Sequence, residues 1–120
     1  MQKIFGSMAV KAFEGRGINP ETASRFSVYT AKAVTLEDGS RDTVPDPSGN
    51  IIVFPFIDGG QEVGAKFRAP GKRFWQRAGG KRTFWNADVM DDPALESGSS
   101  ALIITEGEID ALTAIDCGFP

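Results

Sequence analysis

Three carboxylates near the end of the chain have a type and spacing that could do chemistry. Glu106, Glu108 and Asp110 lie in the string TEGEIDALTAID, which spans residues 105–116. Such carboxylates can bind a hard divalent cation such as Mg²⁺ or act as general bases. The same acids could instead complement the positive end of a helix, which needs no ligand. The spacing alone leaves both interpretations open.

A cluster of cations is the second candidate site. Residues 64–86 contain seven cations and no acid, although the whole chain has a net charge of −3. The seven are Lys66, Arg68, Lys72, Arg73, Arg77, Lys81 and Arg82. A local basic patch of this kind attracts polyanions through phosphate contacts, whatever the net charge of the chain.

Within residues 71–86 the cations are interleaved with four aromatic residues, Phe74, Trp75, Phe84 and Trp85. Trp75, which lies between Arg73 and Arg77, is the best candidate for stacking on an unpaired base, an interaction that contributes about 1 to 3 kcal/mol per base. Phe84 and Trp85 are better interpreted as anchors to the core. Gly79-Gly80-Lys81 is not a Walker-type phosphate loop, because its glycine spacing differs and no Ser or Thr follows the lysine.

The carboxylates need a strand and a helix to position them. Residues 101–105 begin with a short apolar run rich in β-branched residues, which predicts a buried strand. From Glu108 onward apolar residues recur at helical spacing. Glu106 would then lie at the carboxyl end of the strand, where ligands bind in open α/β sheets.

The earlier part of the chain predicts two short helices. The first covers about residues 8–14 and ends near two glycines. The second begins with Asn19 as N-cap and Pro20 at the first helical position, and it extends to about Phe26. Arg16 lies in the tight connection between them. Asp91 and Asp92, which precede a proline, indicate another helix start rather than a metal site.

A β pattern follows these helices. Residues 51–56 form a strongly apolar strand, Asp58-Gly59-Gly60 is a hairpin signal, and residues 62–68 return as the partner strand. On that partner, Lys66 and Arg68 share one face. Residues 37–50 read as a long turn-rich loop to which we assign no chemistry. We expect an α+β fold: a small antiparallel sheet over about residues 27–68, short N-terminal helices, and residues 101–105 as a separate or appended strand.

Composition limits the possible functions. With 41% hydrophobic residues in 120, the chain can bury one modest core. No apolar run approaches the roughly 18 residues that cross a bilayer, so we expect no membrane partner. One cysteine and no histidine exclude an internal disulfide and leave too few soft ligands for a structural zinc site.

The acidic string resembles the first motif of the Toprim domain, in the form found in phage-type and mitochondrial primase-helicases. Residues 15–26, GRGINPETASRF, resemble the opening of the RNA-polymerase domain of the same proteins. The hairpin followed by a basic loop matches the path between these two motifs. The resemblance implies that Glu106 is the catalytic, magnesium-linked carboxylate, supported by Asp110 and Glu108.

The basic residues receive roles in the same way. Arg16, Lys66 and Lys72 align with residues that line the family's active-site cleft and hold nucleotide phosphates or template. Arg68 shares the face of Lys66, and the cluster of Arg73, Trp75 and Arg77 is the expected platform for single-stranded DNA. These seven are the nucleotide- and DNA-binding residues that we expect.

The resemblance implies a DNA primase that makes short RNA primers from nucleoside triphosphates on a single-stranded DNA template. Residues 1–98 would be the N-terminal subdomain of the primase core, and residues 99–120 the first strand-helix unit of a truncated Toprim α/β domain. The second metal motif, Asp-x-Asp, is absent after Glu106. We therefore expect an incomplete Mg²⁺ site, an isolated chain without activity, and a longer parent that could include a helicase domain.

Two other functions remain open at this stage. The chain could be a non-catalytic module that binds single-stranded nucleic acid, or a fragment of a Toprim nuclease or topoisomerase. For the primase we expect a cytoplasmic location, in a bacterium or a phage-infected host cell.

Overall fold

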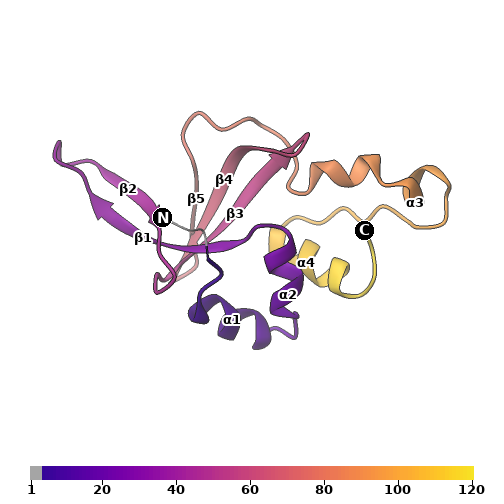
Figure 1. Cartoon of the computed structure of the whole chain (residues 1–120), viewed down its shortest axis with the longest axis horizontal. Helices are drawn as coiled ribbons and strands as arrows, with labels where there is room; N and C mark the ends of the chain where they lie inside the picture. Colours follow the sequence, from indigo (N-terminus) through magenta and orange to yellow (C-terminus); the bar gives the residue numbers. More distant parts are fainter. Residues whose placement is uncertain (1–3) are drawn as a thin grey trace.

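The computed structural model describes residues 4–120 and has an α+β architecture (Figure 1). A single five-stranded antiparallel sheet has the strand order β2-β1-β3-β4-β5. Its strands are β1 (Tyr29–Thr35), β2 (Arg41–Pro45), β3 (Ile51–Asp58), β4 (Gln61–Ala69) and β5 (Arg73–Gln76). The helices are α1 (Ser7–Glu14), α2 (Pro20–Arg25), the 3-10 helix η1 (Ala87–Asp91), α3 (Pro93–Glu96) and α4 (Glu108–Asp116). The expected α+β class and antiparallel sheet are confirmed.

The two N-terminal helices form where the sequence predicts them. The Asn19 side chain accepts a hydrogen bond from the Glu21 amide at 3.0 Å, and Pro20 occupies the first turn of α2. The side-chain cap and the preset φ of proline fix this helix start locally. Asp92 caps α3 in the same way through the Ala94 amide at 2.8 Å, which confirms its interpretation as a helix start.

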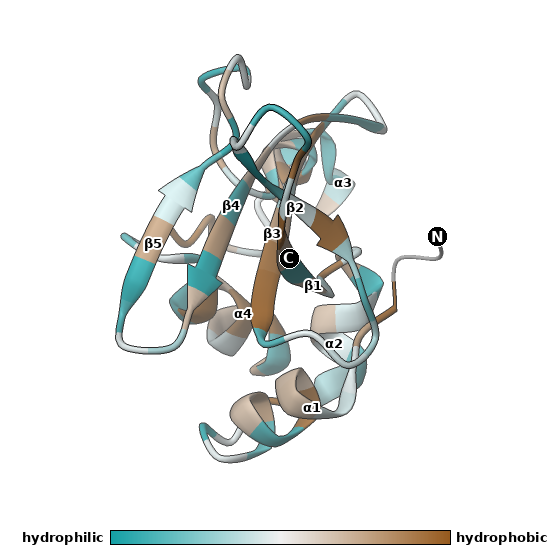
Figure 2. Ribbon diagram, turned by 90° about the vertical axis from the view of Figure 1, so that its left-hand side faces the viewer, coloured by the Kyte–Doolittle hydropathy of each residue, from teal (hydrophilic) through white to brown (hydrophobic). Residues whose placement is uncertain are grey.

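The strand β3 lies at the centre of the sheet and is its most apolar strand (Figure 2). It pairs with β4 through the predicted hairpin, whose Gly59 and Gly60 adopt positive φ values of 62° and 78°. On its other side it pairs with β1 only at Tyr29–Ala31. The rest of β1 pairs with β2 alone, so this hairpin projects from the body (Figure 1).

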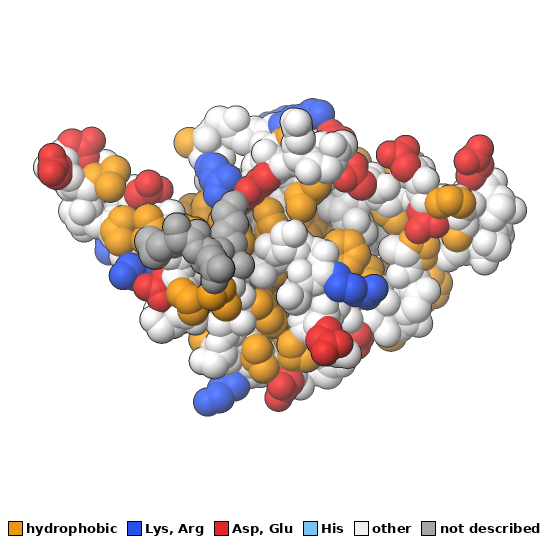
Figure 3. Space-filling model, in the orientation of Figure 1, with side chains coloured by type: hydrophobic (Ala, Val, Ile, Leu, Met, Phe, Trp, Pro, Cys, Tyr) orange, Lys and Arg blue, Asp and Glu red, His pale blue; other side chains and the backbone are white. Residues whose placement is uncertain are grey.

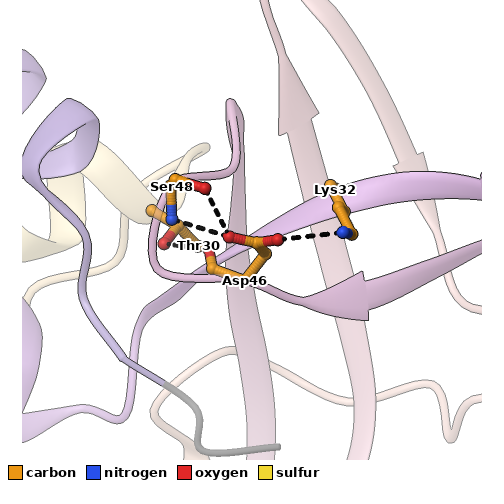
Figure 4. A network of polar contacts seen from close by, with 4 residues as sticks. All are labelled: Thr30, Lys32, Asp46 and Ser48. Atoms are coloured by element: carbon orange, nitrogen blue, oxygen red, sulfur yellow. Dashed lines mark hydrogen bonds and ion pairs between the residues drawn. The ribbon is translucent and has the colours of Figure 1, made fainter.

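A polar network fastens the projecting hairpin to the centre of the molecule. Thr30 is fully buried, and its hydroxyl donates to the Asp46 carbonyl at 2.8 Å and accepts from the Gly6 amide at 3.2 Å. The Asp46 carboxylate accepts from the Ser48 hydroxyl and amide and lies 3.2 Å from Lys32 Nζ (Figure 4). The two strands and the turn after β2 are thereby tied together.

The core has two parts on opposite faces of the sheet. On one face Phe54 packs with Phe13 of α1, Ala23 of α2 and Leu112 of α4, and these helices lie together beneath the sheet (Figure 1). On the other face, Val53 packs with Phe67 in a second cluster. Because side chains of a strand alternate between faces, one continuous apolar strand can serve both clusters.

The structure contains two strands that the sequence does not predict. β2 forms within the stretch interpreted as a loop, and β5 forms beyond the expected end of the sheet. Both pair with a neighbour along the chain, β1 and β4 respectively. None of their residues is buried, and neither strand has an apolar pattern. Backbone pairing rather than burial forms these strands, which explains why hydrophobic periodicity misses them.

The predicted strand at 101–105 is wrong in this structure. The segment pairs with no strand in the part of the chain described, and Leu102, Ile103 and Ile104 are 42%, 44% and 77% exposed. A strand is held by the backbone of a neighbouring strand, and apolar composition does not supply one. The following helix is confirmed as α4, so only half of the expected strand-helix unit is present.

The last helix is joined to the first two. Leu112 is fully buried in their common core, and the Asp116 carboxylate accepts from Thr22 Oγ1 at 2.7 Å and from the Asn19 amide at 3.2 Å. The division of the chain at residue 98 into two subdomains stays a prediction. None of the helices in residues 4–120 has the length and apolar character needed to span a bilayer.

Candidate functional site

A pocket of about 260 Å³ lies between the sheet and the first turn of α4. Arg16 lines it together with Lys66 and Arg68, which follow some fifty residues later in the sequence, and with the acids Glu108 and Asp110. Phe54 and Phe74 supply apolar walls. The structure thus brings together five of the residues that the sequence marks as candidate acids or phosphate ligands.

Simple local rules position these side chains. Lys66 and Arg68 are two residues apart on β4 and therefore point to the same face of the sheet. Their cross-strand partners on β3 are Phe54 and Ile52, whose side chains lie on that same face. Arg16 lies in the turn that follows α1, and Gly17 gives that turn a positive φ of 74°. All three cations thus lie on the face that α4 covers.

An ion pair joins the sheet to α4 inside the pocket. Lys66 Nζ lies 3.0 Å from Glu108 Oε1 and 3.3 Å from Oε2, and it donates a hydrogen bond to Oε2. The Glu108 side chain is 9% exposed and that of Lys66 is 26% exposed. Oε1 is buried and accepts no well-directed hydrogen bond from the described residues, despite its short distance to the ammonium. This carboxylate therefore has acceptor capacity that the protein does not fill.

Arg68 is a cation in an unfavourable environment. Partial burial and, secondarily, the positive charge of Arg16 lower the pKa of the Arg68 guanidinium below its usual value. Its guanidinium lies 5.4 Å from the Phe74 ring, and Lys66 Nζ lies at the same distance from that ring. Within residues 4–120, neither Arg16 nor Arg68 forms an ion pair. Two neighbouring guanidinium groups with this environment would be stabilised by a bound anion.

The acid that the sequence marks as catalytic lies to one side of this pocket. Glu106 is exposed and lines a larger, mainly apolar groove of about 540 Å³, to which Glu108 and Lys66 also contribute. Asp110 is exposed at the smaller pocket. Glu108 and Lys66 therefore lie where the two hollows meet. The sequence ranks Glu106 first, whereas the packing makes Glu108 the most enclosed of the three carboxylates.

The magnesium site implied for Glu106 can be tested against the donor set. No group of three or more Asp, Glu or Cys residues within 4–120 is arranged so that it could hold a metal ion. Mg²⁺ needs near-octahedral oxygen ligands, and a two-metal polymerase centre needs several carboxylates. The described residues alone do not fit that centre, and we derive no step through a metal.

The remaining predicted binding residues lie on the other face or at the edge of the sheet. Trp75 pairs with Phe67 across β4 and β5 and stacks on its ring, with centroids 5.4 Å apart and planes inclined by 24°. The indole is still 37% exposed. Arg77 lies 5.8 Å from the same Phe67 ring and forms a 3.3 Å ion pair with Glu62. Arg73, like Trp75, is exposed on β5.

Lys72 belongs to neither group. It lies in the turn between β4 and β5, with a positive φ of 58°, and it is exposed. The seven predicted ligands thus form three sets: a pocket, an outer face around Trp75, and an isolated turn. The linear cluster is divided because β4 and β5 send alternate side chains to opposite faces.

The two aromatic residues expected to anchor the basic segment behave differently. Trp85 packs against Phe26 and Phe54 with centroid distances of 5.6 and 6.2 Å, as predicted. Phe84 is 77% exposed, so its assignment to the core is wrong. Neighbouring side chains of an irregular extended segment point in different directions, and only one of the two can reach the core.

Two functional or structural roles were not predicted from the sequence. Phe74 contacts both Lys66 and Arg68 in the pocket, and only the pairing of β5 with β4 reveals this. The Asp88 carboxylate accepts from the Gly59 and Gly60 amides at 2.8 and 3.1 Å, which ties η1 to the β3–β4 turn. No sequence signal links residues that are so far apart.

Charge is segregated over the molecule. Acidic side chains gather at both ends of the long axis, over the β1–β2 hairpin and around α3 (Figure 3). Of the seven cations of residues 64–86, Lys66, Arg68 and Arg73 lie on the strands β4 and β5 between these ends, and the other four lie in the turn between these strands or after β5. A polyanion would be repelled by the acidic ends and attracted to the cations between them.

Comparison of the chain with known protein families, with curated proteins and with solved structures found no match.

Proposed function

We propose that this chain is part of a DNA primase, in which the pocket beside α4 holds nucleotide phosphates and the outer face around Trp75 holds single-stranded template. The proposal combines the sequence resemblance with one observation. Arg16, Lys66 and Arg68, from three positions in the sequence, line one pocket next to the acidic start of α4. The pocket volume of about 260 Å³ suits a small phosphate-bearing group rather than a duplex.

The chemistry of the pocket favours a phosphate over a simple carboxylate ligand. Arginine forks bind the oxygens of a phosphate in pairs, and lysine adds a point charge. A triphosphate carries enough negative charge to engage all three cations at once. The amide end of α4 also faces the pocket, and no side chain caps it within the described residues. Its partial positive charge would add to the attraction for phosphate.

The outer face has the properties of a single-strand platform. A base that stacks on the exposed side of Trp75 would extend the existing Trp75–Phe67 stack. Arg73 and the turn residue Lys72 lie nearby in sequence and are free to contact the backbone of the strand. Primer synthesis requires the incoming nucleotide to pair with a template base, so the template would run from the outer face around the edge strand β5 to the pocket.

The binding roles can be tested with matched variants. Arg68→Gln should weaken binding of ATP by about tenfold, which corresponds to the loss of one charge-assisted contact of roughly 1.4 kcal/mol, and should leave DNA binding on the outer face little changed. Trp75→Ala should weaken binding of an oligothymidine by about five- to tenfold and spare ATP. Arg82→Gln, an exposed change of equal charge, is the control. Equal losses of both ligands in Arg68→Gln and Arg82→Gln, with no loss in Trp75→Ala, would show that only net charge matters.

Catalysis requires a separate measurement. In the longer protein that we propose, Glu106→Gln should abolish RNA primer synthesis while template binding persists, because the change keeps the shape and removes the charge. Primer synthesis at a normal rate would refute the catalytic role of Glu106.

The alternative function is a non-catalytic module for single-stranded nucleic acid. The exposed Trp75 platform would serve it equally well, since stacking needs no carboxylates. Under this alternative, Trp75→Ala weakens binding of the oligothymidine by the same roughly five- to tenfold, but no protein that contains the chain makes primers.

A further inference from the structure

We infer that Glu108 is an internal competitor for the phosphate ligand: its carboxylate occupies Lys66 when the pocket is empty and must give up that contact when a phosphate binds. Glu108 would thus set the affinity of the pocket, and would discriminate against weakly charged anions. The inference rests on the proposed phosphate-binding role of the pocket.

The first support is the geometry of the ion pair. Both carboxylate oxygens of Glu108 lie within 3.3 Å of Lys66 Nζ, so the ammonium is already engaged by an anion on the pocket wall. Lys66 and Glu108 both line the pocket, and an incoming phosphate oxygen would approach the same ammonium. Lys66 has three donors, but Glu108 partly neutralises its charge.

The second support is the unequal pairing of the three cations. Lys66 is paired, whereas Arg16 and Arg68 have no acidic partner within residues 4–120. A ligand can therefore contact the two guanidinium groups without displacing anything. Only the third contact, with Lys66, requires competition with Glu108. A phosphate chain with several negative charges can displace the Glu108 carboxylate from Lys66, whereas a monovalent anion competes with that carboxylate less well.

The third support is the incomplete hydrogen bonding of Glu108 itself. Its side chain is nine-tenths buried, and Oε1 accepts no well-directed hydrogen bond from the described residues. A carboxylate held only by one imperfect ion pair is less firmly fixed than one with several donors. Its release from Lys66 therefore costs less than the rupture of a fully bonded pair.

The test uses inorganic tripolyphosphate as the probe and isothermal titration calorimetry at low salt. Glu108→Gln should bind tripolyphosphate about three- to tenfold more tightly than the unmodified chain, the range expected for freeing one partly buried charge. The glutamine keeps an oxygen that can accept from Lys66, so the fold should be retained. Asp110→Asn removes the same charge from an exposed residue of the same pocket, and it should tighten binding less than about twofold.

A double variant isolates the role of Lys66. In a Lys66→Gln background, Glu108→Gln should have no larger effect than Asp110→Asn, because the competition has been removed. A thermal melt without ligand checks folding, and the shift of the melting temperature by tripolyphosphate gives a second readout for any variant of lower stability.

The outcomes separate the two proposals. If the unmodified chain binds and Glu108→Gln tightens binding no more than Asp110→Asn, the competition is refuted and the pocket proposal stands. Persistence of the full Glu108→Gln effect in the Lys66→Gln background also refutes it. If neither the unmodified chain nor Glu108→Gln binds tripolyphosphate, both proposals fail.

Discussion

Replacing Leu112 with alanine tests whether α4 is docked as described, and hence whether the pocket exists. Leu112 is fully buried and is the one buried residue of α4 within the described chain. It packs in the cluster that includes Phe13 and Phe54. Buried Leu→Ala changes typically cost about 2 to 5 kcal/mol, from the lost transfer energy and the cavity that remains. Because Leu112 is fully buried, we expect a loss of about 3 kcal/mol.

Urea unfolding followed by circular dichroism measures this loss. With an m-value of about 1.5 kcal/mol per M, typical of a small domain, a loss of about 3 kcal/mol lowers the midpoint by about 2 M. Leu102→Ala is the matched control, because Leu102 is 42% exposed, and it should cost less than about 1 kcal/mol. If Leu112→Ala cost no more than Leu102→Ala, α4 would not be packed in the core. The pocket, two of whose carboxylates come from α4, would then lose its basis.

Two further predictions concern the polar contacts that hold the hairpins. Hydrogen bonds from the Ser48 hydroxyl and amide, followed by the contact with Lys32, lower the pKa of Asp46 from 3.8 to about 2. Because the pKa of Asp46 is depressed in the folded state, the stabilising contribution of the Asp46 carboxylate is complete above about pH 4 and is lost as the pH falls toward 2. The difference in unfolding free energy between the unmodified chain and Asp46→Asn, measured by urea unfolding at a series of pH values, should therefore shrink across that window. A difference that is constant with pH would contradict this assignment. Asp88→Ala removes the carboxylate that accepts hydrogen bonds from the Gly59 and Gly60 amides. Since such a hydrogen bond contributes roughly 1 kcal/mol, hydrogen exchange at these two amides should become about fivefold faster or more. The amides of Thr30 and Asp46 are the control and should exchange at an unchanged rate.

The sequence predicts those elements whose cause is local. The second helix could be predicted because Asn19 and Pro20 define its start within two residues. The β3–β4 hairpin could be predicted because its turn needs the two glycines that the sequence supplies. β2 and β5 could not, because both depend on pairing with a neighbour and neither buries a face of its own.

The segment 101–105 is the opposite case. Its composition is that of a strand, but composition sets only the preference of a segment and not its partner. In the described structure its apolar side chains line the larger groove together with Phe84 and Met90, which are 77% and 65% exposed. From the sequence one could therefore predict that the segment is apolar and leads to Glu108. The sequence could not predict whether another strand pairs with this segment.

The candidate site shows the same limit at the level of charge. Seven cations in one stretch of sequence suggest a single basic surface, but alternation along β4 and β5 places Lys66 and Arg68 on one face and Trp75 on the other. The pocket then gains a third cation, Arg16, from a turn some fifty residues earlier in the chain. Glu108, which the sequence resemblance makes a supporting acid beside Glu106, becomes the ion-pair partner of Lys66. We therefore expect the affinity of the proposed phosphate pocket to depend on the docking of α4, which supplies the carboxylate of Glu108, as much as on the number of cations.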